Sequence, residues 1–186
     1  MRNLIPILVA LSLLAGCKSR PPRHPNEFLD PVTAAMVSSV SSPIIFARAH
    51  QDVAANSRQY VNIVATSINR QGRYEYILLV YVWSTVDARL GAGAHPGETL
   101  VFLADERAIR LQRDGRSLKE VGIAKPLLRP LHFHGAPRIY KTDRDTLKFM
   151  AAARHVRLQL EGDQDARPFD IWTDGRKQLG SLAATN

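Results

Sequence analysis

The sequence predicts a mainly β protein, with an antiparallel, β-sandwich-like single domain that contains one or two short helices and follows an N-terminal leader. From Pro43 onward, short runs of β-branched and aromatic residues alternate with turn residues, as in antiparallel sandwiches and barrels. The dipeptide Asp114-Gly115 separates two such runs and is a strong hairpin signal. The chain of 186 residues contains one cysteine, so a hydrophobic core rather than a disulfide network must stabilise the domain.

The first predicted element is a short amphipathic helix over Glu27–Val40. Its apolar residues recur at helical spacing, and Pro31 lies near its start, where a proline fits the first turn. Residues 38–43 then end this helix.

The middle of the chain is predicted to form a meander of strands. The run Tyr74–Thr85 is apolar on both faces, so we expect this strand in the middle of the fold. The predicted strands are, in order, Ile44–His50, Tyr60–Ile68, Tyr74–Thr85, Glu98–Leu103, Arg107–Arg113 and Ser117–Ile123.

A second helix is predicted to begin at Thr142, where a threonine can cap the first turn and apolar residues then recur at helical spacing. His155–Glu161 alternates between apolar and polar residues, which predicts a strand. The runs Pro168–Trp172 and Arg176–Leu182 flank the turn dipeptide Asp174-Gly175, so a closing hairpin is expected.

The N-terminus has the three parts of a secretory signal: Arg2, an apolar run over Leu4–Ala15, and small residues before Cys17. The apolar run is too short to span a bilayer as a helix of about 20 residues. The segment Leu14-Ala15-Gly16-Cys17 resembles the lipobox of bacterial lipoproteins. This resemblance implies that residues 1–16 are removed and that the Cys17 sulfur carries a diacylglycerol.

The chain is therefore predicted to have three parts. Residues 1–16 form the signal peptide, residues 17–26 form the lipidated cysteine and a Pro-rich basic tether, and residues 27–186 form the single mainly β domain. Lys18, Arg20 and Arg23 place positive charge beside the membrane. Under the sorting rule of the lipoprotein family, a residue other than Asp after the cysteine implies the outer membrane. We expect the domain in the cell envelope, anchored to the outer membrane and facing the periplasm.

The formal net charge of +8 falls to +7 once Arg2 is removed, and a positive surface favours anionic partners such as phospholipid headgroups or cell-wall polymers. Export makes nucleic acid a poor candidate partner. The densest basic cluster is a row in which arginine recurs every third residue. It is a candidate anion site because guanidinium groups bind phosphates and carboxylates in a bidentate manner, although a solvated face is the favoured interpretation. The row consists of Arg107, Arg110, Arg113 and Arg116.

The segment His132-Phe133-His134 is the candidate metal site. If this segment is extended, both imidazoles project from one face and can begin a metal site with a third ligand from His95 or a carboxylate. A solvated polar face is the favoured alternative. The acidic segment over residues 161–165 lacks the spacing of a known calcium loop and is interpreted as a hydrophilic hairpin turn.

The sequence carries no Gly-x-Ser-x-Gly or Ser-x-x-Lys motif, and its one thiol is expected to be acylated. The expected function is therefore a non-enzymatic binding or assembly-support module, without a cofactor, that offers a strand edge or a loop surface to another envelope protein or a cell-wall polymer. A metal-dependent or hydrolytic envelope enzyme that uses His132 and His134 is the alternative. A carrier of an apolar ligand is a third hypothesis, and it requires an interior cavity.

Overall fold

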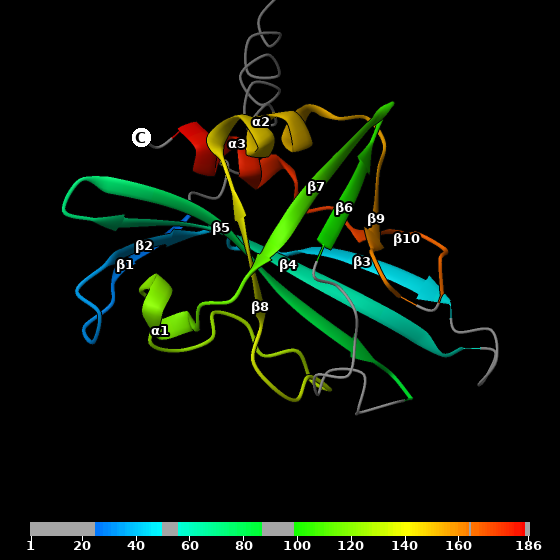
Figure 1. The fold of residues 1–186 in the computed structure, drawn as a ribbon, viewed down its shortest axis with the longest axis horizontal. Helices are drawn as coiled ribbons and strands as arrows, with labels where there is room; N and C mark the ends of the chain where they lie inside the picture. The colour runs from blue at the N-terminus through cyan, green and yellow to red at the C-terminus, as the bar shows by residue number, and fades with distance from the viewer. Residues whose placement is uncertain (1–24, 50–55, 87–98, 164, 185–186) are drawn as a thin grey trace, which may run out of the picture.

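The computed structural model describes residues 25–49, 56–86, 99–163 and 165–184. Within these residues, ten antiparallel strands form one sheet and three short helices pack against it (Figure 1). No helix among the described residues is long and apolar enough to cross a membrane. The strands are β1 (Asn26–Leu29), β2 (Met36–Ser39), β3 (Ile44–Ala49), β4 (Arg58–Arg70), β5 (Arg73–Ser84), β6 (Thr99–Ala104), β7 (Arg107–Asp114), β8 (Arg138–Thr142), β9 (Val156–Leu160) and β10 (Phe169–Thr173).

The sheet closes into an eight-stranded barrel, so the predicted sandwich is wrong although the mainly β, antiparallel class is confirmed. Hydrogen bonds connect the strands in the circular order β4, β3, β10, β9, β6, β7, β8 and β5, and β5 pairs with β4 to close the ring. The run of short alternating strands is common to both architectures. The pair that closes the ring is a long one, since β4 and β5 are hydrogen-bonded along twelve residue pairs, from Gln59 opposite Ser84 to Arg70 opposite Arg73.

Large side chains fill the interior of the barrel, as is usual for a barrel of eight strands. Val61 and Ile63 of β4 face inward, and the strand registers place the other inward residues on the same side of the sheet. Among the largest fully buried side chains on this inner face are Phe46, Phe102, Phe169, Tyr140, Leu78 and Leu100.

The outer face of β5 is also buried, which confirms the prediction that this strand lies in the middle of the fold. Ile77, Leu79 and Tyr81 alternate with the inward-facing residues and are fully buried. The segment between β7 and β8 covers this part of the outer face. Phe133 packs edge-on against Tyr81 at a ring-centroid distance of 5.1 Å, and the Leu128 amide donates to the Tyr81 hydroxyl at 3.3 Å.

The helix predicted from Thr142 is confirmed as α2 (Arg144–Ala152), which begins one residue later because Asp143 is its N-cap. The strand predicted over Ser117–Ile123 is wrong, since this segment contains α1 (Leu118–Val121). Ser117 and Glu120 form a capping box, in which each side chain accepts a hydrogen bond from the backbone of the other. The part of the chain that the structure describes thus has three short helices where one or two were expected.

The last predicted strand, over Arg176–Leu182, is also wrong, because this segment forms most of α3 (Lys177–Ala184). Its buried residues Leu179, Leu182 and Ala183 are three and four positions apart, which is helical spacing. The helices α2 and α3 lie side by side over the sheet in Figure 1, and their apolar residues belong to the same core as the barrel interior.

The helix predicted over Glu27–Val40 is wrong, because the segment forms the hairpin β1–β2. The side chain of Asp30 accepts hydrogen bonds from the Val32 and Thr33 amides, and Ala34 adopts a positive φ of 53°. These contacts fold residues 30–35 into a turn, which reverses the chain and excludes a continuous helix.

The hairpin β1–β2 extends the sheet beyond the barrel. The first half of β4 pairs with β3 and the second half pairs with β2, so both neighbours share one edge of the same long strand. Within the described residues, β1 is the strand with a single hydrogen-bonded neighbour. We call the extension formed by β1, β2 and the adjoining ends of β4 and β5 the overhang.

Candidate functional site

The predicted lipidation site, Cys17, lies outside the described residues, as do the signal peptide and most of the tether. The lipid anchor therefore stays a prediction. The candidate third metal ligand His95 also lies outside the described residues.

The arginine row of the β7 hairpin is divided by the structure. Arg107 lies over the ring of Phe149 on α2, with its guanidinium carbon 5.2 Å from the ring centroid. Arg116 donates to Glu75 and Asp114, and its hydrogen bonds lower the pKa of Asp114. These two arginines are thus engaged at different places on the surface.

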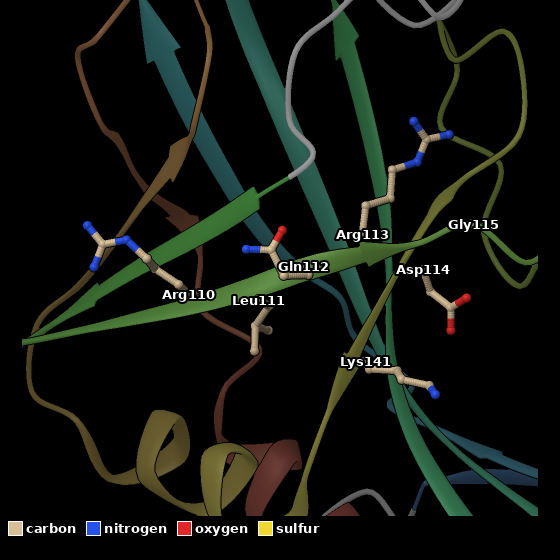
Figure 2. Close-up of a pocket in the computed structure, with 7 residues that line it drawn as sticks. All are labelled: Arg110, Leu111, Gln112, Arg113, Asp114, Gly115 and Lys141. Carbon is tan, nitrogen blue, oxygen red and sulfur yellow. The ribbon is translucent and has the colours of Figure 1, made fainter.

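The remaining two arginines, Arg110 and Arg113, line an open hollow of about 390 Å³ with Lys141 and Asp114. Figure 2 shows that the Arg110 and Arg113 side chains point in different directions. Arg110 is also paired with Glu161 at 3.3 Å. The cations do not converge on one point, and anion binding here stays a prediction.

His132 and His134 lie in an irregular segment and are exposed, so they do not share the face of a strand. The ring of His132 instead lies 5.9 Å from the ring of Trp83. Within the described residues, no three His, Cys, Asp or Glu side chains are grouped so that they can hold a metal ion. The metal site stays a prediction.

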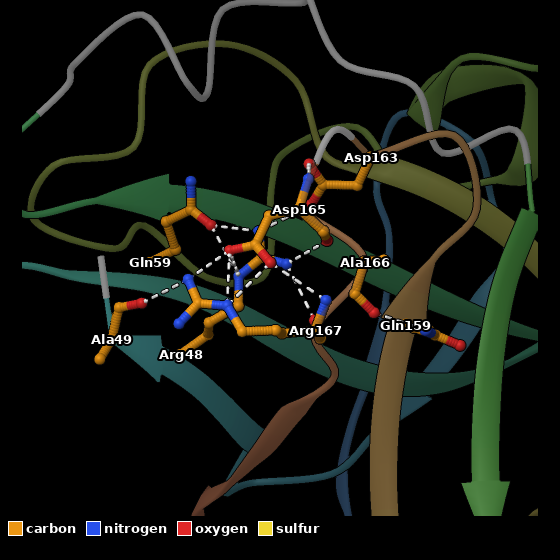
Figure 3. Close-up of polar contacts among 8 residues, drawn as sticks. All are labelled: Arg48, Ala49, Gln59, Gln159, Asp163, Asp165, Ala166 and Arg167. Carbon is orange, nitrogen blue, oxygen red and sulfur yellow. Dashed lines mark hydrogen bonds and ion pairs between the residues drawn. The ribbon is translucent and has the colours of Figure 1, made fainter. Parts of the chain in front are cut away.

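The acidic segment predicted to be a hairpin turn binds a buried arginine. Arg48 of β3 follows the inward-facing Phe46 by two residues, and its guanidinium lies 4.1 Å above the ring of Phe169. It donates to the Asp163 carboxylate at 2.7 Å, to the carbonyl oxygens of Asp165 and Arg167 at 2.7 and 2.9 Å, and to Gln59 (Figure 3). These contacts pair the positive charge of Arg48 and give each of its N–H groups an acceptor, which indicates a structural role. We call Arg48 and the residues of the acidic turn that it contacts the clamp.

A row of aromatic side chains crosses the outer face of the barrel. Tyr60 and Trp83 stack with a centroid distance of 4.4 Å and an interplanar angle of 15°. Trp172 meets the same Tyr60 edge-on at 6.1 Å, and His132 lies beyond Trp83. We call Trp172, Tyr60, Trp83 and His132 the aromatic row; it joins both tryptophans of the chain.

The sheet register explains why these residues meet. Tyr60 is directly opposite Trp83 in the β4–β5 pair, and directly opposite Ala47 in the β3–β4 pair. The small side chain of Ala47 leaves room for Trp172, which reaches across from β10 at an irregular point in its register with β3. The indole nitrogen of Trp83 donates to Asn62 Oδ1 at 3.1 Å, so the indole of Trp83 has a fixed orientation.

The exposed end of the row carries a cation. Trp172 is 57% exposed, and the guanidinium carbon of Arg58 lies 4.9 Å from the centroid of its ring. A rigid aromatic surface next to an arginine can bury a large apolar area and accept polar contacts with little loss of conformational entropy. The row is thus suited to bind another molecule.

The aromatic row is not apparent from the sequence. Tyr60, Trp83 and Trp172 are far apart in the sequence, and their meeting depends on registers that the sequence does not specify. The turn between β4 and β5 could have revealed part of the row. A hairpin centred on residues 71 and 72 places Tyr60 directly opposite Trp83.

Comparisons of this chain with protein-family models, with curated proteins and with solved structures found no match.

Proposed function

We propose that this protein is a non-enzymatic binding module, held in the cell envelope by a lipid on Cys17, and that the aromatic row binds another envelope protein. The lipobox supports the anchor and the compartment. The observation that carries the binding function is the aromatic row, with a half-exposed tryptophan beside an arginine.

The composition of this surface matches that of protein interfaces. Trp, Tyr and Arg are the residues most enriched at positions that contribute strongly to binding energy. Such positions are surrounded by contacts that exclude water, and the neighbouring Tyr60 and Trp83 are already partly buried. The free protein thus holds the exposed indole in place before a partner arrives, which lowers the entropy cost of association.

The stack of Tyr60 on Trp83 has a structural role as well, because cross-strand aromatic pairs stabilise sheets. Trp172 does not need to be exposed for that role. Its indole lies at the edge of the stack, with more than half of its surface in solvent. This exposed ring is the part of the row that favours a binding function over a purely structural one.

The two other hypotheses receive less support from the described residues. A carrier requires space in the barrel, and the interior is filled by buried side chains such as Phe46, Phe102 and Phe169. A metal enzyme requires converging ligands, and His132 packs against Trp83.

The test is affinity purification of the full, tagged protein from detergent-solubilised membranes, with mass spectrometry and elemental analysis of the same eluate. We expect one dominant envelope protein. Trp172→Ala should weaken its retention by at least tenfold, because a central aromatic contact contributes about 2 kcal/mol or more. Tyr74→Ala is the matched control, since it removes an exposed aromatic ring far from the row, and it should retain the partner.

Equal capture by the wild type and by both variants would refute the role of the aromatic row. Stoichiometric zinc without a partner protein would overturn the proposal of a binding module. It would favour the alternative hypothesis, a metal-dependent envelope enzyme that uses His132 and His134.

A further inference from the structure

One end of the overhang exposes apolar side chains from β1, β2 and β5, with Asn69 of β4 between them. Leu29, Met36, Asn69 and Tyr74 occupy directly opposite positions on β1, β2, β4 and β5, and they therefore share one face of the sheet. Leu29 is 60% exposed and Tyr74 is 47% exposed. Val32, in the turn between β1 and β2, is 62% exposed.

This end of the overhang is rigid. The buried Asp30 carboxylate accepts the Val32 and Thr33 amides through one oxygen and the Ala124 amide at 2.7 Å through the other. The Thr33 hydroxyl donates to the Gly122 carbonyl at 2.7 Å, which ties the turn to the end of α1. The apolar side chains are therefore presented by a fixed surface and not by a loose loop.

Two arginines flank the turn at this end of the overhang. Arg70 and Arg73 are directly opposite each other next to the β4–β5 turn, which lies at the same end of the sheet as the β1–β2 turn (Figure 1). They follow Asn69 and precede Tyr74, so they belong to the other face of the sheet, where Arg70 donates to the Glu120 carbonyl at 2.7 Å. Of the nearby carboxylates, Glu75 is paired with Arg116, whereas Glu27 and Glu120 accept hydrogen bonds from serine hydroxyls and stay negatively charged. Exposed Leu, Val and Tyr side chains next to arginines are typical of surfaces that contact a bilayer with anionic headgroups.

The predicted anchor lies within reach of this surface. Nine residue steps separate Cys17 from Asn26, which is a reach of about 28 Å for an extended Pro-rich chain. Leu29 follows only three residues later, at the end of β1. A lipid on Cys17 would therefore keep the overhang close to the membrane even if no other part of the protein contacted the bilayer.

We propose that the end of the overhang, with Leu29, Val32, Tyr74 and the flanking Arg73, docks on the phospholipid bilayer in which Cys17 is anchored. This inference rests on the proposed lipid anchor. The two acyl chains of a diacylglycerol on Cys17 would hold the protein at the membrane, and the contact of the overhang with the bilayer would fix the orientation of the domain.

The docked orientation places the aromatic row away from the membrane. Tyr74 and Asn69 lie at one end of the β4–β5 hairpin, and Tyr60 and Trp83 lie at the other. The nine residue steps from Asn69 to Tyr60 span about 30 Å along a strand. The long hairpin then acts as a spacer that presents the aromatic row to a partner in the periplasm.

The test is the water accessibility of a spin label at position 32 in the full, lipidated protein, reconstituted in phosphatidylcholine vesicles with added phosphatidylglycerol. Cys17 is the only cysteine of the chain, and a lipid would block its sulfur in the lipidated protein, so Val32→Cys gives a single labelling site. Glu106→Cys, in the exposed β6–β7 turn, is the matched control. Collision with dissolved oxygen reports the bilayer, and collision with a nickel chelate reports water.

The label at position 32 should show severalfold less collision with nickel, relative to oxygen, than the label at position 106. Tyr74→Asp, combined with the label at position 32, should restore access to nickel. Mass spectrometry of the N-terminal peptide establishes the state of Cys17 in the same sample.

Equal nickel access at positions 32 and 106, with Cys17 acylated, would overturn the docking and leave the binding module intact. An unmodified Cys17 would overturn both the anchor and the docking. Spin–spin broadening between labels at position 32 would assign this surface to a second copy of the chain and would likewise overturn the docking.

Discussion

At the scale of single residues, the clamp around Arg48 shows how a local prediction can be correct and incomplete. The acidic residues after β9 are in a turn, as their composition predicts. Their partner could not be predicted, because Arg48 and Asp163 are 115 positions apart in the sequence and meet only when β3, β10 and β9 are neighbours. The turn is thus acidic because it closes over a buried cation.

The clamp predicts a defined dependence of stability on pH. A hydrogen bond from the Arg167 side chain, with a contribution from the charge of Arg48, lowers the pKa of Asp165 from 3.8 to about 2. Because the folded-state pKa lies below the unfolded value, the ionised carboxylate stabilises the fold above pH 3.8, and this contribution is lost as the pH falls toward 2. Because the Asp165 side chain is partly exposed to solvent, its contribution to the free energy of unfolding is limited to about 1 kcal/mol.

Chemical denaturation of the wild type and Asp165→Asn across this pH range measures the effect. The difference in the free energy of unfolding should be constant above about pH 5 and should shrink between pH 4 and pH 2. Arg167→Ala should remove most of this pH dependence. A difference that stays constant down to pH 2 would show that the carboxylate is not stabilised by the clamp.

At the scale of elements, the sequence predicted seven of the eight barrel strands and missed β8, and it assigned the wrong structure to three other segments. The strands β3, β4, β5, β9 and β10 were expected within a few residues of their observed bounds, because runs of β-branched and aromatic residues between turn signals, and the alternation in β9, specify strands directly. The errors at α1, α3 and β1–β2 arose where a few side chains decide the structure. A capping box, a helical apolar spacing and the turn at Asp30 outweighed the general composition in these three segments.

The hairpin β1–β2 should therefore depend strongly on Asp30. Asp30→Ala leaves the amides of Val32, Thr33 and Ala124 without their acceptor, which should lower the free energy of unfolding by about 2 kcal/mol. Val32→Ala is the control in the same turn, and as an exposed substitution it should change stability by less than about 0.5 kcal/mol. Urea denaturation measures both variants, and equal stabilities would argue against the role of Asp30.

At the scale of the whole molecule, the closure of the sheet determines where function can lie. A sandwich and a barrel share the same strand pattern, so the sequence could not decide between them. Closure fills the interior with side chains and leaves the outer face, the overhang and the single edge at β1 as the surfaces offered by the described residues. The aromatic row and the overhang lie at opposite ends of the β4–β5 hairpin, which suits a protein that binds a membrane at one end and a partner at the other.

Site-specific photocrosslinking in intact cells tests the binding function most directly. A photoreactive phenylalanine derivative in place of Trp172 should form one discrete adduct with another envelope protein. The same derivative in place of Tyr74, which is exposed at the far end of the β4–β5 hairpin, should not form this adduct. The absence of an adduct at position 172, or the same adduct at both positions, would contradict the binding function assigned to the aromatic row.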